Sequence, residues 1–203
     1  MASDYRIKGV KKLIVLGKRI HKSGFKGYPG LTNTALKIAE YIPKCVVYVE
    51  PFAGLGRVAK HIKSKIMVLN DKSEYACKEN RNHFPNAFVE SRDFEDCIKE
   101  WNGKDTFFLI DPPWTYSAYA ENDKSFCDRL PKAYYDKILE LLRNSPSHWF
   151  VCCEHRQNLS GYEKYYSMVI YAHNSKNYGF GLAKTKLYSN RPFTRYNQST
   201  LDI

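Results

Sequence analysis

The sequence of 203 residues predicts an α/β fold with a mostly parallel sheet of about seven strands. Three observations predict this class. Short apolar runs alternate along the chain with stretches of helical spacing, the pattern of βαβ units. Several of these runs end in an acidic residue, so polar side chains are expected at strand ends. The last two runs are separated by the glycine-containing segment 174–181, which favours a C-terminal antiparallel hairpin.

The expected elements follow in chain order from hydrophobic spacing and turn residues. A helix is expected over 35–41, capped by Thr32 or Asn33 and ended by Pro43. The further expected helices cover 55–64, 73–83, 94–101 and 132–144. The expected strands cover 45–50, 66–70, 87–90, 106–110, 149–153, 166–172 and 183–189.

Composition indicates one globular, intracellular domain. Hydrophobic residues make up 43% and charged residues 26% of the chain, which is ordinary for soluble proteins. The longest apolar stretch near the N-terminus, Leu13 to Leu16, is shorter than the ~7–15 residues of a signal-peptide core. No run approaches the ~20 residues that span a bilayer. The six cysteines show no zinc-ligand spacing, so we expect reduced core cysteines in a cytoplasmic protein without membrane contact.

The charge of the chain points to a polyanionic partner. The formal net charge is +11, which favours nucleic acid before membrane. Residues 1–27 contain many lysines and arginines against a single aspartate, so they are expected to form a basic arm preceding one domain over 28–203. Contacts to phosphates are expected from residues of this arm that include Lys8, Lys11, Lys12, Lys18 and Arg19.

The strongest motif is Asp-Pro-Pro-Trp at 111–114, directly after the apolar run that ends at Ile110. Two adjacent prolines fix the backbone and leave carbonyl groups without ladder partners. The Asp111 carboxylate and the Pro112 carbonyl can then accept both hydrogens of an amino group on a planar ring, and Trp114 can stack on that ring. The alternative is an ordinary turn after a strand.

A second motif, Glu-Pro-Phe-Ala-Gly-Leu-Gly at 50–56, follows the first apolar strand. Its glycines, Gly54 and Gly56, allow close approach of the backbone to a ligand at the carboxyl end of a strand. The full dinucleotide pattern Gly-x-Gly-x-x-Gly is absent, because position 59 is Ala59. Two further acids also follow strands: Asp71 could hold a ribose hydroxyl pair, and Asp93 with Phe94 could accept and cover an adenine ring.

As an ordered set, these motifs resemble the class I S-adenosylmethionine-dependent methyltransferases, which have a Rossmann-like fold, and within them the Dam-type adenine-specific DNA methyltransferases. In that family the glycine motif binds the methionine end of S-adenosylmethionine, and the Asp-Pro-Pro-aromatic motif is catalytic. The segment Phe25-Lys-Gly-Tyr-Pro-Gly30 and the ending Lys186-Leu-Tyr-Ser-Asn190 are also similar to the family. The resemblance covers about residues 25–190.

The resemblance implies roles for two sets of residues. The cofactor-binding set would be Tyr28, Glu50, Pro51, Phe52, Ala53, Gly54, Gly56, Asp71, Asp93 and Phe94. The catalytic set would be Asp111, Pro112, Pro113 and Trp114. The expected function is methyl transfer from S-adenosylmethionine to the exocyclic amino group of adenine in DNA. Tyr116 and Tyr119 could cover the extruded base, or they could pack within the loop that follows the catalytic motif.

Two departures from the family bear on the substrate. The motif ends in Trp114 where the family usually has tyrosine, a variant better known from messenger-RNA adenine methyltransferases. Only 54 residues separate Gly56 from Asp111, which leaves no room for an inserted target-recognition region. Recognition is then expected from another part of the chain, from a protein partner or from a homo-oligomer. An RNA adenine methyltransferase and a non-catalytic nucleic-acid-binding subunit stay as alternatives, whereas a protein glutamine methyltransferase typically has Asn in place of Asp111.

Overall fold

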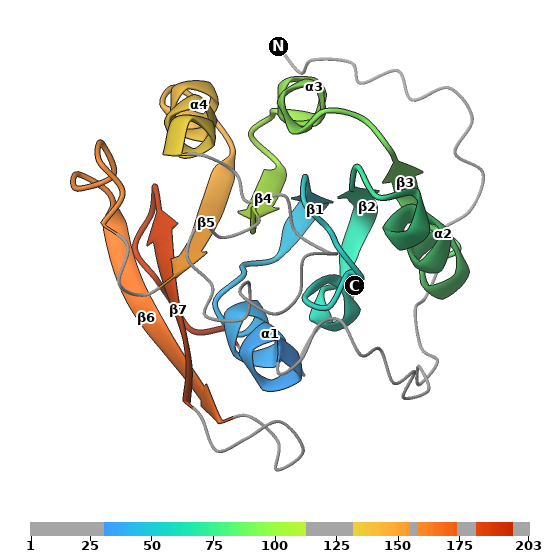
Figure 1. Cartoon of the computed structure of the whole chain (residues 1–203), viewed down its shortest axis with the longest axis horizontal. Helices are drawn as coiled ribbons and strands as arrows, with labels where there is room; N and C mark the ends of the chain where they lie inside the picture. The colour runs from blue at the N-terminus through green and yellow to red at the C-terminus, as the bar shows by residue number, and fades with distance from the viewer. Residues whose placement is uncertain (1–30, 113–131, 155–157, 174–181, 197–203) are drawn as a thin grey trace.

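A single seven-stranded sheet organises the computed structural model, which describes residues 31–112, 132–154, 158–173 and 182–196. The strand order is β3-β2-β1-β4-β5-β7-β6 (Figure 1). The strands are β1 (Cys45–Glu50), β2 (Ser64–Asn70), β3 (Phe88–Glu90), β4 (Thr106–Ile110), β5 (His148–Glu154), β6 (Tyr166–His173) and β7 (Leu182–Ser189).

The strand directions confirm the predicted mixed sheet. β1 pairs in parallel with β2 and β4, β2 pairs in parallel with β3, and β4 pairs in parallel with β5. β7 lies between β5 and β6 and runs antiparallel to both. The β6–β7 pair is therefore the antiparallel C-terminal hairpin expected from the sequence, and β6 forms one edge of the sheet.

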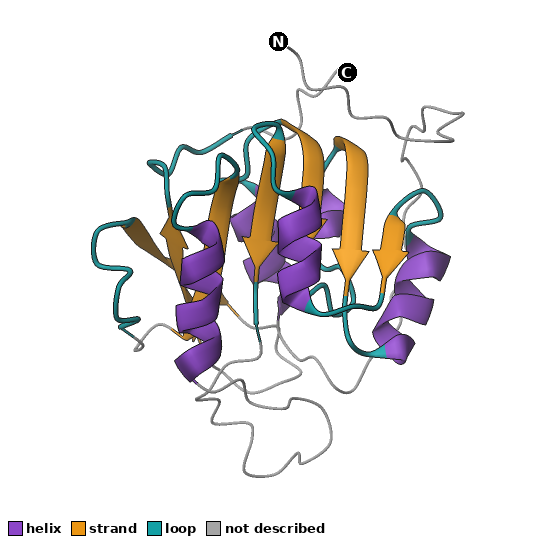
Figure 2. Cartoon of the chain, turned by 90° about the horizontal axis from the view of Figure 1, so that it is seen from above, coloured by secondary structure: helices purple, strands orange, loops and turns teal. Residues whose placement is uncertain are grey.

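Alternate residues of the strands face two different apolar layers. Tyr48 and Phe107 pack toward the layer that contains α1 (Leu31–Ala39) and the short 3-10 helix η1 (Ala59–His61). Val49 and Phe108 pack toward the layer that contains α3 (Phe94–Trp101) and α4 (Lys132–Leu142). The remaining helix, α2 (Glu74–His83), lies against β2 and β3. Helices therefore cover both faces of the sheet (Figure 2), as burial of apolar residues on both faces requires.

The expected helix over 55–64 is wrong. Only the one-turn η1 forms there, and β2 already begins at Ser64, opposite Cys45 of β1. Gly56 has a positive φ of 59°, so a regular helix cannot run through it, and Ile62 is extended. Ser64, at the end of the expected helix, instead belongs to β2 and pairs in parallel with β1.

The first helix also differs from the expectation. α1 begins at Leu31, so the backbone of Thr32 and Asn33 already belongs to the helix, whereas an N-cap residue precedes it. It ends at Ala39 because the amides of Tyr41 and Ile42 bond to carbonyls only three residues back, which tightens the last turn. The other expected elements are found, with boundaries that agree within two residues.

The strand order places a topological switch point between β1 and β4. The chain continues from β1 to β2 and β3 on one side, then crosses to β4 on the other side. Ligands of open α/β sheets bind outside the carboxyl ends of the strands at such a point. Several neighbouring strands in Figure 2 point to this same edge of the sheet.

Two expectations from composition can be checked within the part of the chain that the structure describes. Its cysteines are free thiols, and four of the five are buried: Cys77, Cys97, Cys152 and Cys153. None of its helices has the length and apolar character needed to cross a membrane.

Candidate active site

The four acids that the sequence predicts for the site lie at the carboxyl edge of the sheet. Glu50 ends β1, Asp71 follows β2, Asp93 follows β3 and Asp111 follows β4. Because parallel strands end at one edge, these four acids lie on successive strand ends. The negative charges of Asp111 and Asp71 are close enough to Glu50 to raise its pKa. Glu50, Asp71 and Asp111 thus form one electrostatic group around the switch point.

Glu50 is the most buried acid of this group, with 4% of its surface exposed. Burial raises the pKa of its carboxyl from 4.5 to about 8, although hydrogen bonds from the Tyr48 hydroxyl and the Ala59 amide oppose the shift. The Tyr48 hydroxyl donates to Glu50 Oε1 over 2.6 Å. Glu50 is therefore held in one orientation at the end of β1, and it binds a proton readily.

The loop after Glu50 is held by hydrogen bonds from β2 and α2. The Ala53 amide donates to the Asn70 carbonyl over 2.8 Å, and the Gly54 amide donates to Asp71 Oδ2 over 2.7 Å. Asn80 of α2 donates from Nδ2 to the Gly54 carbonyl over 2.9 Å. Three separate contacts thus fix residues 53–54 before any ligand arrives.

The two glycines of this loop serve different purposes. Gly54 has φ of 50°, and a Cβ built on it would meet nothing within 4 Å, so its backbone faces open space. Gly56 has φ of 59°, but its Cβ would lie 2.7 Å from Cε2 of Phe84. The sequence predicted that both glycines give a ligand access to the backbone. The geometry supports this role for Gly54, whereas Gly56 is required for packing against Phe84.

Asp71 already accepts two backbone hydrogen bonds. Besides the bond from Gly54, its Oδ1 accepts from the Ser73 amide over 2.8 Å. The Ser73 hydroxyl in turn caps α2 by accepting from the Ala76 amide. Asp71 therefore joins the glycine loop to the start of α2, and the remaining lone pairs of its carboxylate are still available to a ligand hydroxyl.

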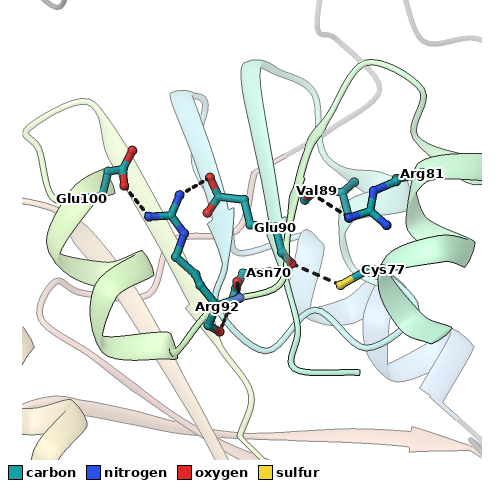
Figure 3. A network of polar contacts seen from close by, with 7 residues as sticks. All are labelled: Asn70, Cys77, Arg81, Val89, Glu90, Arg92 and Glu100. Carbon is teal, nitrogen blue, oxygen red and sulfur yellow. Dashed lines mark hydrogen bonds and ion pairs between the residues drawn. The ribbon is translucent and has the colours of Figure 1, made fainter. Parts of the chain in front are cut away.

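Sequence reasoning missed Asn70, the residue before Asp71. Its buried side chain donates to the carbonyls of Pro51 and Arg92, over 3.0 and 3.1 Å, and accepts from the Arg92 amide over 3.0 Å. Arg92 also forms ion pairs with Glu90 and Glu100 (Figure 3). Asn70 thus ties the loops after β1 and β3 together. The sequence feature that could have identified Asn70 is a polar residue that directly follows an apolar run at the end of a strand.

Asp93 and Phe94 have structural contacts of their own. Asp93 caps α3 by accepting from the Glu95 amide over 2.9 Å, and it pairs with Lys72 over 2.8 Å. Although partial burial raises the pKa of Asp93, these contacts outweigh it and lower the pKa below its usual value. The buried Phe94 ring stacks on Phe52, with centroids 5.1 Å apart. Their predicted contacts with an adenine ring stay a prediction.

The predicted catalytic motif is described by the structure at its first two residues, Asp111 and Pro112. Ile110 is fully buried, Asp111 is partly exposed and Pro112 is buried, so Asp111 stands where the core opens to solvent. The other predicted catalytic and substrate-binding residues lie outside the described residues: Pro113, Trp114, Tyr116, Tyr119, Lys11, Lys12, Lys18 and Arg19. The same holds for Tyr28 of the predicted cofactor-binding set.

The chemistry of the described site fits an organic cofactor better than a metal ion. Within the described ranges, no three His, Cys, Asp or Glu side chains come together as metal ligands. A ligand at the switch point would instead meet the open backbone of Gly54 and the lone pairs of Asp71 that the backbone leaves free, close to the buried carboxyl of Glu50. These groups suit hydroxyl and ammonium donors of a nucleoside-containing molecule.

Comparison with known proteins gives structural likeness without sequence likeness. No protein-family model and no curated sequence matches the chain. A Pyrococcus horikoshii protein proposed to be an RNA methyltransferase has a TM-score of 0.53 at 10% identity, over 82% of this chain and 84% of that one.

Two streptococcal structures give slightly lower values. A proposed methyltransferase from Streptococcus mutans, in complex with SAH, has a TM-score of 0.47 at 10% identity, over 78% of this chain and 96% of that one. An rRNA methylase from Streptococcus thermophilus has 0.48 at 10% identity, over 79% and 95%. At such identities the likeness concerns the fold alone, and the Pyrococcus horikoshii structure confirms the predicted Rossmann-like class.

Proposed function

We propose that the chain is an S-adenosylmethionine-dependent methyltransferase that acts on the exocyclic amino group of adenine in nucleic acid. One observation carries the proposal: Glu50, Asp71 and Asp111 lie at the ends of three strands around a topological switch point, beside a glycine loop that is open at Gly54. This is where α/β sheets bind nucleotides. The shared fold of the Pyrococcus horikoshii structure supports the class of enzyme.

In this proposal the cofactor is bound by residues of the first two strand ends. Glu50 and the Gly54 backbone would hold the methionine end, and Asp71 would hold the ribose hydroxyls with the lone pairs that Gly54 and Ser73 leave free. Lys72, Asp93 and Phe94 lie beyond Asp71, where the adenine ring would be expected. The SAH complex of the Streptococcus mutans protein is consistent with this cofactor.

Asp111 and Pro112 would bind the amino group that is methylated. Bound S-adenosylmethionine supplies an electrophilic methyl group. The amino nitrogen of adenine is a poor nucleophile because its lone pair is conjugated with the ring. Hydrogen bonds from its two hydrogens to the Asp111 carboxylate and the Pro112 carbonyl would localise that lone pair as the nitrogen gains positive charge. The predicted stacking on Trp114 would hold the ring in place.

DNA is the expected nucleic acid from the resemblance to Dam-type enzymes, and RNA fits the structure equally. Trp114 as the last motif residue favours RNA, and the short distance from Gly56 to Asp111 leaves no inserted DNA-recognition region. A non-catalytic subunit with this fold would not need an intact glycine loop or Asp111. Both are present, which favours the enzyme.

Two measurements test the proposal. Calorimetry with S-adenosylmethionine and S-adenosylhomocysteine separates an enzyme from a non-catalytic subunit, and we expect binding of both. A methyl-transfer assay with labelled cofactor on duplex DNA, single-stranded DNA and RNA, followed by nucleoside analysis, identifies the substrate. We expect N6-methyladenine in one of the three. Absence of cofactor binding at millimolar concentration would overturn the proposed function.

A further inference from the structure

The β6–β7 hairpin has a basic and aromatic face. Its two strands contain the lysines Lys184 and Lys186 and no acidic residue. Tyr171 and Lys184 are direct cross-strand partners, and Lys184 Nζ lies 5.7 Å from the centroid of the Tyr171 ring. Half of the Tyr171 side chain, 50%, is exposed on the edge strand. An exposed aromatic ring beside an ammonium group is a common contact for an unpaired base and its phosphate.

Two further lysines lie on or near the hairpin. Lys37 of α1 donates to the Tyr171 carbonyl, which brings a second ammonium group to the same strand position. Lys186 lies 5.0 Å from the Tyr188 ring and donates to Asn158 over 2.8 Å. Among the residues that the structure describes, no ion pair joins Lys37 or Lys184 to a carboxylate. Within the described residues, the charges of Lys37 and Lys184 are therefore not neutralised by an ion pair.

The register places this face at the edge of the sheet that carries Asp111. Ile110 is level with Val151 of β5, and the next β5 residue, Cys152, is level with Leu187 of β7. Lys184 lies three residues beyond Leu187, in the direction in which β4 runs. With ~3.3 Å per residue and ~4.8 Å between strands, the Cα atoms of Lys184 and Asp111 are roughly 14 Å apart. Figure 1 shows the hairpin flanking β5 on the side away from β1.

We propose that the face formed by Tyr171 and Lys184, together with Lys37 beside the edge of β6, binds a single-stranded stretch of the nucleic-acid substrate next to the target base. The lysines would contact phosphates, and Tyr171 would stack on a flanking base. This inference rests on the proposed function for the position of the target base. Charge complementarity selects the partner, because uncompensated lysines and a net charge of +11 favour a polyanion. The hairpin would then supply part of the nucleic-acid recognition for which the chain has no inserted region between Gly56 and Asp111.

The test compares two variants with two matched controls. The variants are Tyr171→Ala and Lys184→Ala. The control for the ring is Tyr166→Ala, because Tyr166 is equally exposed at 52% but pairs with Ser189 at the other end of β6. The control for the charge is Lys104→Ala, an exposed lysine just before β4 at the opposite edge of the sheet. All four positions are on the surface, and thermal unfolding verifies that each variant is folded.

Fluorescence anisotropy with short labelled single-stranded RNA and DNA measures binding. Tyr171→Ala is expected to raise Kd at least about fivefold, the fold-change of losing one stacked base. Lys184→Ala is expected to reduce the steepness of log K against log salt by ~0.7, the value for the loss of one phosphate contact on a single strand. The two controls are expected to bind as the unaltered chain does. Comparison of the Kd values for RNA and for DNA shows which of the two nucleic acids the face binds.

Two further measurements separate failure of this inference from failure of the proposed function. Calorimetry with S-adenosylmethionine is expected to give the same affinity for all variants, because β4 and β5 separate the hairpin from β1, which leads into the glycine loop. Nucleic-acid binding without cofactor binding would overturn the proposed function and leave the surface assignment standing. Cofactor binding with unchanged nucleic-acid affinity in both variants would overturn the surface. A change of molar mass in light scattering, with nucleic-acid affinity unchanged, would make this face an interface between copies of the chain.

Discussion

The Oδ2 atom of Asp71 accepts a hydrogen bond from the Gly54 amide over 2.7 Å, which joins the acid after β2 to the loop after β1. Its Oδ1 accepts from the Ser73 amide over 2.8 Å. Both oxygens of this carboxylate are thus used by the backbone before a ligand binds. Asp71 is therefore expected to support the loop as well as to contact the ribose.

This double role predicts that Asp71→Asn is not a conservative change. An asparagine can accept only one of the two backbone hydrogen bonds, and its NH2 group would face the other amide hydrogen. We expect the free energy of unfolding to fall by about 1–3 kcal/mol, together with weaker binding of S-adenosylmethionine. Urea unfolding and calorimetry measure the two effects. The matched control is Asp105→Asn, an exposed residue before β4, which should change stability by less than ~0.5 kcal/mol. Weaker cofactor binding with unchanged stability would contradict the supporting role.

Gly54 and Gly56 form a second matched pair, because both have positive φ but only one has a close neighbour. Gly56→Ala would place a Cβ 2.7 Å from Phe84, whereas Gly54→Ala would meet nothing within 4 Å. We expect Gly54→Ala to lower stability by about 1–2 kcal/mol, the cost of a left-handed backbone. Gly56→Ala should cost a further ~1–3 kcal/mol through overpacking. Chemical denaturation of both variants measures the difference, and equal losses would show that Phe84 moves aside freely.

The same two glycines illustrate what the sequence could and could not predict. Local patterns were sufficient for β4, whose five residues are all buried and, apart from Thr106, apolar, and for the hairpin. The helix expected over 55–64 failed because the conformation of Gly56 and the contact with Phe84, 28 positions away in sequence, decide the path of the chain. Helix propensity is a property of a short stretch of sequence, so it cannot predict a contact between residues this far apart.

The candidate site divides in the same way. Glu50, Asp71 and Asp111 were predictable because each stands at the end of an apolar strand or directly after it, and parallel strands bring their ends together. Asn70 was missed because its role depends on Pro51 and Arg92, which are 19 and 22 positions away along the chain. Tyr48 was likewise expected only as a strand residue, although its hydroxyl orients Glu50. Supporting polar residues are recognised only when their partners are known.

The buried carboxyl of Glu50 predicts a pH dependence of stability. Burial raises its pKa from 4.5 to about 8 in the folded chain. The folded state therefore keeps a proton that the unfolded chain loses above pH 4.5. The stability that this proton supplies is fully present below pH 4.5 and is lost as the pH rises to about 8. The loss is on the order of 3–5 kcal/mol across this window.

Glu50→Gln should remove this dependence, because the glutamine amide is neutral at every pH and its oxygen still accepts from the Tyr48 hydroxyl. We expect the unaltered chain to lose stability relative to the variant between pH 5 and 8, measured as the urea midpoint at each pH. Other titrating groups are present in both proteins, so the difference isolates Glu50. Parallel pH profiles of the two proteins would contradict the raised pKa.

The basic arm over 1–27 is predicted to contact phosphates through Lys11, Lys12, Lys18 and Arg19. Deletion of residues 1–22 should weaken nucleic-acid binding and flatten its salt dependence, because fewer counterions are released. Anisotropy titrations at several salt concentrations measure both quantities. The Tyr171→Ala variant is the useful comparison, because loss of a stacked base changes affinity with little change in salt slope. An unaltered slope after the deletion would make the arm a solvated tail.

Asp111 and Trp114 are expected to act at different stages of the reaction. The hydrogen bond from the amino group to Asp111 strengthens as the nitrogen gains positive charge, so Asp111→Ala should abolish methyl transfer and leave cofactor affinity close to that of the unaltered chain. Stacking on Trp114 differs little between ground and transition states. Trp114→Ala should therefore weaken productive substrate binding by roughly 1–3 kcal/mol, and Trp114→Tyr should keep much of the activity.

Single-turnover methyl transfer and cofactor calorimetry on the same preparations separate these effects. For Asp111→Ala, the rate at saturating substrate should fall, while the cofactor Kd stays constant. For Trp114→Ala, a higher substrate concentration should restore much of the rate, because the loss lies in binding. Near-normal turnover of Asp111→Ala would mean that the Asp-Pro-Pro-Trp segment is a structural turn after β4. The amino group of the substrate would then have to be bound by other residues at the switch point, and Glu50, held by Tyr48 at the neighbouring strand end, would be the next to test.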